Sequence, residues 1–109
     1  MAHSAILIDP FAQQMSLVPF DDLGVSDIQE TIGCQYFEAH GLATGDVLYV
    51  DETGRLDGAQ AGFRLPQANS SFVGRALLVG VDENGDNMTP LLTLQALIRS
   101  ICWLGGEPS

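Results

Sequence analysis

The segment GDVLYVDETGRL, residues 45–56, is the strongest indicator of how this chain folds. Its residues 47–50 form a β-branched and aromatic run, which is typical of a mostly buried strand. Residues 51–54 are typical of a reverse turn, because an aspartate at the first position can bond its own backbone and a glycine at the fourth can take a positive φ. Residues 55–56 then begin a return strand, so the segment predicts a β-hairpin around which the rest of the chain is organised.

Two apolar runs upstream predict a first hairpin. Residues 5–8 and 15–18 have strand character, and the loop between them covers residues 10–14. Pro19 is predicted to end the second strand, because proline has no N–H to donate to a sheet.

A short helix is predicted next, over residues 27–32, with Ser26 as its N-cap. Its two isoleucines are four residues apart and therefore share one face. Gly33 is the natural C-terminal stop. Residues 34–39 include two aromatic residues and predict another strand.

The second half of the chain contains another apolar strand and a second turn of the same kind. Residues 63–65 form a short extended piece that Pro66 ends, and residues 67–71 are polar enough to predict an exposed loop. Residues 76–81 predict a strongly apolar strand, which runs into a second Asp-Glu-x-Gly turn at residues 82–85.

The last predicted element is an amphipathic helix over residues 94–104, capped by Thr93. Its apolar residues follow a helical spacing and are expected to pack across a sheet face: Leu94, Leu97, Ile98, Ile101 and Leu104. Strands that come in hairpins, with helices inserted singly, predict an α+β fold with a mainly antiparallel sheet. By length, residues 1–109 are predicted to form one domain.

The composition indicates a globular protein and restricts its partners. The 109 residues are 46% hydrophobic and 17% charged, which argues against disorder. No apolar run approaches the ~20 residues of a membrane-spanning helix, and residues 5–8 are too short for a signal peptide, so we expect a cytoplasmic protein without membrane contact. Fourteen acidic residues against four arginines give a formal charge of −10, which repels nucleic acids and attracts basic protein surfaces.

The residues that could carry chemistry do not form a catalytic or metal-binding pattern, and we predict neither a cofactor nor a metal. Cys34 follows a predicted helix C-terminus, where the helix dipole disfavours a thiolate, so we interpret it as a small buried strand residue and not as a partner of His40. The two cysteines and two histidines lack the paired spacing of a zinc site. Residues 82–86 fit a turn better than a calcium loop, because the glycine comes fourth and not sixth. The sequence therefore predicts a non-enzymatic protein.

The order of these elements resembles that of a family of phage and bacterial proteins of unknown function. Four segments carry the resemblance: residues 28–37, 47–56, 74–85 and 92–104. They supply a helix with a glycine turn and an aromatic strand, an apolar strand with an Asp-Glu-x-Gly turn, a glycine-led strand that ends Val-Gly-Val-Asp, and a last helix. Where that family often has Asn-Arg after the central hairpin, this chain has Phe63-Arg64. The resemblance implies a mobile-element accessory protein and brings no catalytic residues.

These observations favour a small acidic binding protein from a phage or mobile element. We expect it to inhibit a host defence system (an anti-CRISPR or anti-restriction role) by binding a basic protein surface, without contacting nucleic acid directly. The predicted binding residues are the acids of the two turns: Asp51, Glu52, Asp57, Asp82, Glu83 and Asp86.

An alternative hypothesis is a small-molecule-binding, anion-binding or enzymatic domain. It would use Arg64, Arg75 and the polar loop of residues 67–71, because two arginines can hold an anion bidentately. The simpler interpretation is that each arginine offsets nearby acids.

A homodimer or partner interface is predicted on the helix face opposite the apolar stripe. At about 100° per residue, Trp103 lies opposite Leu94, with Arg99 one turn before it and Ala96 on the same side. Tryptophan and arginine are enriched at binding hot spots. If no other chain binds there, the N-terminal hairpin is expected to cover this face.

Overall fold

The structure, a computed structural model, describes residues 3–52 and 61–105. Two α-helices and nine strands lie within these ranges. In chain order they are β1 (His3–Asp9), β2 (Gln14–Phe20), α1 (Val25–Ile32), β3 (Phe37–Gly41), β4 (Val47–Asp51), β5 (Ala61–Leu65), β6 (Ser70–Val73), β7 (Ala76–Val81), β8 (Asn87–Met88), α2 (Leu94–Ser100) and β9 (Cys102–Gly105). Neither described helix is long and apolar enough to cross a membrane.

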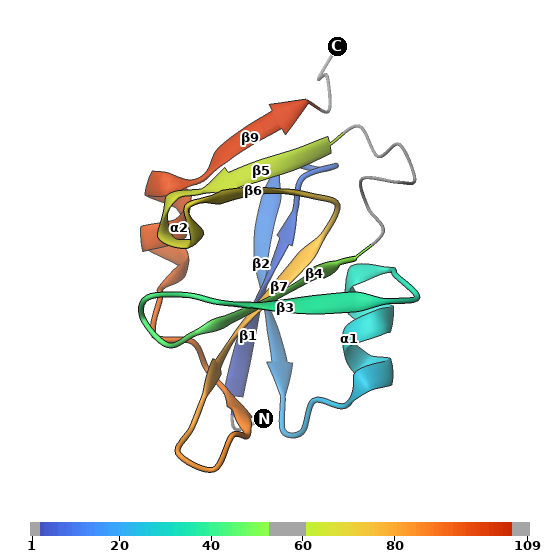
Figure 1. Ribbon diagram of the computed structural model, residues 1–109, viewed down its shortest axis with the longest axis vertical. Coiled ribbons are helices and arrows are strands. Elements are labelled where there is room, and N and C mark those ends of the chain that lie inside the picture. Colours follow the sequence, from blue (N-terminus) through green and yellow to red (C-terminus); the bar gives the residue numbers. More distant parts are fainter. Residues whose placement is uncertain (1–2, 53–60, 106–109) are drawn as a thin grey trace.

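The strands form two sheets, and every pairing between them is antiparallel. The larger sheet has the order β2-β1-β7-β4-β3, with β8 paired to β7, and the smaller sheet has the order β6-β5-β9. In Figure 1 the smaller sheet lies at the top, with α2 at the left, and α1 lies at the right of the larger sheet. A mostly antiparallel α+β fold with two short helices is thereby confirmed.

Strand β7 is buried on both of its faces and forms the middle of the larger sheet. Ala76 and Leu78 point to one hydrophobic core, and Leu77 and Val79 point to another, as the alternation of a strand requires. All four side chains are fully buried. This run, and not residues 45–56, is therefore the centre of the fold.

The two cores lie on opposite faces of the larger sheet. The first core is closed by the smaller sheet and by α2, which contribute Phe63 and Leu97, both fully buried. The second core is closed by α1 through Ile28 and Ile32. The larger sheet is thus the middle layer of the molecule.

The central hairpin is only partly confirmed. The predicted strand at residues 47–50 is β4, but β4 pairs with β3 on one edge and with β7 on the other. Its hairpin partner is therefore the preceding strand, joined through the turn at residues 42–46. The predicted return strand at residues 55–56 lies outside the described residues.

The first hairpin is confirmed, but its second strand does not end before Pro19. Strand β2 continues to Phe20, and Pro19 lies opposite Ser4 of β1. Proline is tolerated there because β2 is an edge strand, so the missing N–H removes no bond to a further strand.

Helix α1 begins earlier than predicted, and its N-cap is Gly24, not Ser26. The Asp27 carboxylate accepts the Gly24 N–H at 2.9 Å, which satisfies the helix start without a serine cap. Gly33 ends the helix at φ 69°, as predicted. The next strand starts at Phe37 and not at Cys34, because the Cys34 N–H still bonds the helix carbonyl of Gln29 at 3.0 Å.

Two further predictions are wrong in the C-terminal half. Residues 67–71 are not an open loop, since a 3-10 turn (Pro66–Ala68) leads directly into β6.

Thr93 caps α2 by accepting the Ala96 N–H at 3.1 Å, as predicted, but the helix ends at Ser100 and the chain continues as β9. The predicted apolar stripe includes Ile98, but the Ile98 side chain is 58% exposed and does not belong to the buried face of the helix. The extended segment is favoured because β9 supplies β5 with a second neighbouring strand.

Candidate functional site

The two acidic turns lie at opposite ends of the larger sheet. Asp51 ends β4 and Asp82 follows β7, and these strands are antiparallel neighbours. The structure therefore does not combine the two turns into one surface. Asp57 lies outside the described residues.

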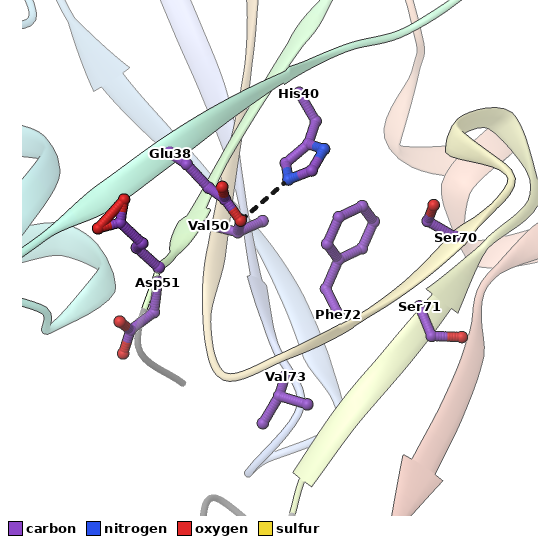
Figure 2. Close-up of a pocket in the computed structure, with 9 residues that line it drawn as sticks. Glu38, His40, Val50, Asp51, Ser70, Ser71, Phe72 and Val73 are labelled. Carbon is purple, nitrogen blue, oxygen red and sulfur yellow. Dashed lines mark ion pairs between the residues drawn. The ribbon is translucent and has the colours of Figure 1, made fainter. Parts of the chain in front are cut away.

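The end of the larger sheet that carries Asp51 borders a cleft between the two sheets (Figure 2). The cleft has a volume of about 220 Å³. Strands β3 and β4 form one wall and β6 forms the other. Its lining residues are Glu38, His40, Val50, Asp51, Glu52, Ser70, Ser71, Phe72 and Val73.

The polar groups of this cleft are arranged around a histidine. His40 Nε2 lies 3.3 Å from a carboxylate oxygen of Glu38, and its ring meets the Phe72 ring edge-on at 5.0 Å (Figure 2). Phe72 is only 6% exposed and forms part of the cleft wall, whereas Glu38 and His40 remain partly open to solvent. The arrangement can accept hydrogen bonds from a cationic group.

The other acidic turn contributes to a larger hollow, which we call the acidic hollow. Its acids come from the connector between β2 and α1 and from the β7–β8 turn: Asp21, Asp22, Asp82 and Asp86. The hollow has a volume of about 540 Å³, and His3 also lines it. Two segments about 60 residues apart in the sequence are thus brought together by the β1–β7–β8 pairing.

The β7–β8 turn is held by Asp82. One carboxylate oxygen of Asp82 accepts the N–H groups of Asn84 and Asp86, both at 2.9 Å, and Gly85 takes a φ of 86°. These are the bonds expected of turn chemistry. Glu83 is exposed and is not among the residues that line the hollow. Within the described residues, no group of three or more His, Cys, Asp or Glu side chains is placed to hold a metal ion.

The structure places Arg64 and Arg75 at different sheets, and anion binding by the two arginines stays a prediction. Arg64 lies on β5 of the smaller sheet, whereas Arg75 immediately precedes β7 of the larger sheet. The Arg75 Nε lies 3.5 Å from the Asp9 carboxylate, and its guanidinium lies 5.4 Å from the centre of the Phe11 ring. Arg75 therefore offsets a nearby acid, as the simpler interpretation expected.

The predicted face of Ala96, Arg99 and Trp103 does not exist as one helix face. Ala96 and Arg99 lie on α2, but Trp103 lies in β9, opposite Phe63 of β5. Trp103 packs, partly buried, against the first core. Whether these residues contact another chain stays a prediction.

Cys34 is partly buried, although it lies in the helix cap and not in a strand. Burial, and to a lesser extent the negative charge of Asp51, raises the pKa of its thiol. A raised pKa leaves less reactive thiolate at a given pH.

We therefore expect iodoacetamide at about pH 8 to alkylate the exposed Cys102 faster than Cys34. Peptide mass spectrometry over a time course measures the two rates. In urea the two rates should become similar, because the difference comes from the fold. Faster modification of Cys34 in the folded protein would contradict this account.

The sequence interpretation overlooked part of both sites. Asp21 and Asp22 were visible as an acidic pair, but no local pattern indicates that they face Asp82. Glu38 alternates with His40 along one strand, and this period-two spacing is the signal that could have placed both on one wall of the cleft.

Comparison with known protein families matches residues 2–100 to the family described as Domain of unknown function (DUF3846). No curated protein and no solved structure matches the chain.

Proposed function

We propose a function from the premise that this chain belongs to the family Domain of unknown function (DUF3846), whose description names no activity. The protein is a non-catalytic binding protein that captures a basic protein surface. The acidic hollow is the contact site. The observation that carries this proposal is the convergence of Asp21, Asp22, Asp82 and Asp86 on one concave surface.

The distribution of the described positive charges supports this site. Arg64, Arg75 and Arg99 are the arginines in the described part of the chain, and none of them lines the acidic hollow. A neighbouring hollow extends the negative surface along α1 through Asp27 and Glu30. The formal charge of −10 adds a long-range field of the same sign. Such a field accelerates association with a basic partner and weakens as salt increases.

The partner we propose is a nucleic-acid-binding protein of a host defence system, with this chain encoded by a phage or mobile element. Such partners present a basic groove whose natural ligand carries negative charge. A small acidic protein can occupy that groove by charge complementarity. The resemblance described above and the acidity of the chain support this choice.

Charge reversal in the acidic hollow tests the proposal. The double variant Asp22→Lys/Asp86→Lys leaves Asp82, which holds the turn, unchanged. We expect its affinity for a fluorescent arginine-rich peptide to fall by about tenfold or more, and the salt dependence of binding to weaken. Fluorescence anisotropy at low and at physiological salt measures both effects.

The matched control is Glu38→Lys/Glu52→Lys, which changes the net charge equally but at the cleft of Figure 2. We expect this control to retain most of the peptide affinity. Equal weakening by both variants would show that net charge alone attracts the peptide and would overturn the assigned site. Capture from a host lysate, with the same two variants, then identifies the natural partner.

A further inference from the structure

The outer edge of β2 is the longest strand edge left without a partner among the described residues. Strand β2 has seven residues and lies at the end of the larger sheet, where it pairs with β1 alone. Four of its residues are exposed: Gln14, Ser16, Leu17 and Pro19. An unpaired strand edge offers a row of N–H and C=O groups to any other strand.

This edge has part of the usual protection against pairing, because Pro19 lies near its C-terminal end, but it lacks a charged side chain. Natural edge strands carry charged side chains, particularly lysine, to prevent association. Strand β2 carries no charged residue, although the chain has fourteen acids, and its Leu17 is 57% exposed. Two copies of a chain with a formal charge of −10 can therefore approach along β2 without bringing carboxylates of this strand together.

The direction of the backbone groups on β2 can be derived from β1. The Ser4 N–H donates to the Thr89 hydroxyl at 2.9 Å, on the side of β1 that faces away from β2. Ser4 lies opposite Pro19, so Pro19 and every second residue before it direct their backbone groups to the outer edge. Met15 and Leu17 therefore present a free N–H and C=O outward.

A hollow of about 270 Å³ with mixed polar and apolar walls lies beside this edge. Gln13, Gln14 and Met15 line it from the β1–β2 hairpin, and Ile98, Ile101 and Trp103 line it from the C-terminal segment. Met15 and Leu17 lie opposite Ile8 and Ile6, which point to the first core, so both side chains are on the sheet face that carries this hollow. Hydrogen-bonding groups and exposed apolar surface thus occur together.

We propose that a second copy of this chain pairs with β2, edge to edge and antiparallel, to form a two-fold symmetric dimer. A copy supplies the same uncharged edge, as an isologous interface requires. The backbone N–H and C=O groups of Met15 and Leu17 point outward and therefore define the register of the pairing. Met15 of one copy exchanges hydrogen bonds with Leu17 of the other, and the two Ser16 residues lie opposite each other. Pro19, which cannot donate, then falls outside the paired segment.

This register also covers the exposed apolar side chains. Leu17 of one copy becomes the cross-strand neighbour of Met15 of the other, on the face that carries the hollow. The exposed Leu17 and Ile98 would then contact protein and not water. The dimer does not depend on the acidic hollow, which is lined by other residues.

The test compares the wild-type chain with Leu17→Lys and Leu91→Lys by sedimentation equilibrium. We expect the wild type at twice the chain mass of 11.6 kDa, and Leu17→Lys at the chain mass, because a lysine protects an edge strand. Leu91→Lys is the matched control: the same substitution at a side chain that is 67% exposed but lies neither on β2 nor among the residues that line the hollow beside it. It should remain a dimer. Circular dichroism checks that both variants are folded.

A second measurement keeps the proposal testable if Leu17→Lys does not fold. Hydrogen exchange followed by NMR should show the Met15 and Leu17 amides protected in the wild type, and their protection should fall on dilution. A wild type that sediments at the chain mass at every concentration overturns the proposal. A dimer in which these two amides exchange freely overturns the assigned edge.

Discussion

Replacing Asp46 with alanine is expected to lower the free energy of unfolding by about 3–5 kcal/mol. Asp46 is the buried charged residue of the described core, at 1% exposure. One carboxylate oxygen accepts the Leu91 N–H and the other accepts the Leu92 N–H, both at 2.9 Å. The second oxygen also lies 3.0 Å from the Thr44 hydroxyl. Removal of the carboxylate leaves the Leu91 and Leu92 N–H groups without their partner at a position where the Asp46 side chain is buried.

The physical role of Asp46 is to fasten the segment before α2 to the β3–β4 turn. This bond spans 45 residues of sequence, and it positions the chain so that Leu97 can enter the first core. Urea denaturation followed by circular dichroism measures the loss. Asp82→Ala is the matched control, because Asp82 also accepts two backbone N–H groups at 2.9 Å but is exposed. We expect that control to lose about 1 kcal/mol or less, since water can replace those bonds. Equal losses would show that burial of Asp46 does not matter.

Replacing Trp103 with alanine is expected to destabilise the monomer by about 2–4 kcal/mol. The indole packs against the first core from β9, where Trp103 lies opposite the fully buried Phe63. Its removal leaves a cavity at the junction of the smaller sheet and α2. Because Trp103 remains partly exposed, the loss should lie below that of a fully buried tryptophan.

Leu104→Ala is the control for this prediction, since the neighbouring side chain is 39% exposed and points to the other face of β9. We expect a loss of about 1 kcal/mol or less for this variant. Both variants are measured by urea denaturation at a protein concentration at which the wild type is monomeric. If Trp103→Ala were as stable as the wild type, the indole would not stabilise the core. That result would contradict this prediction and favour the predicted role of Trp103 in binding.

Local patterns in the sequence identified several elements at nearly the correct residues. The apolar run at residues 76–81 is β7, and residues 47–50 lie within β4. Gly33 and Thr93 mark the end of α1 and the start of α2. These signals are readable because they depend on neighbours within a few residues: a positive φ, a side-chain cap, or an apolar strand between two turns.

The end of α2 could not be determined locally. Residues 94–104 satisfy a helical apolar spacing, but Ile101 already has an extended backbone. The decisive contact is the pairing of β9 with β5, a strand about 40 residues earlier in the chain. Tertiary pairing of this kind overrides a modest helical preference. The predicted arrangement of Ala96, Arg99 and Trp103 on one helix face is wrong for the same reason, since it required Trp103 to lie on the helix.

The sequence by itself therefore determined the acidity of this protein, most of its strands and turns, and the α+β class, because composition and short-range periodicity suffice for these. Only the tertiary structure decided which acids share a surface. Antiparallel pairing of β4 and β7 separates Asp51 from Asp82, and the connector before α1 brings Asp22 to the Asp82 turn instead. Strand order joins residues that are distant in the chain, and no local pattern encodes that order. The uncharged character of β2 was visible in the sequence, but its place at the edge of the sheet was not.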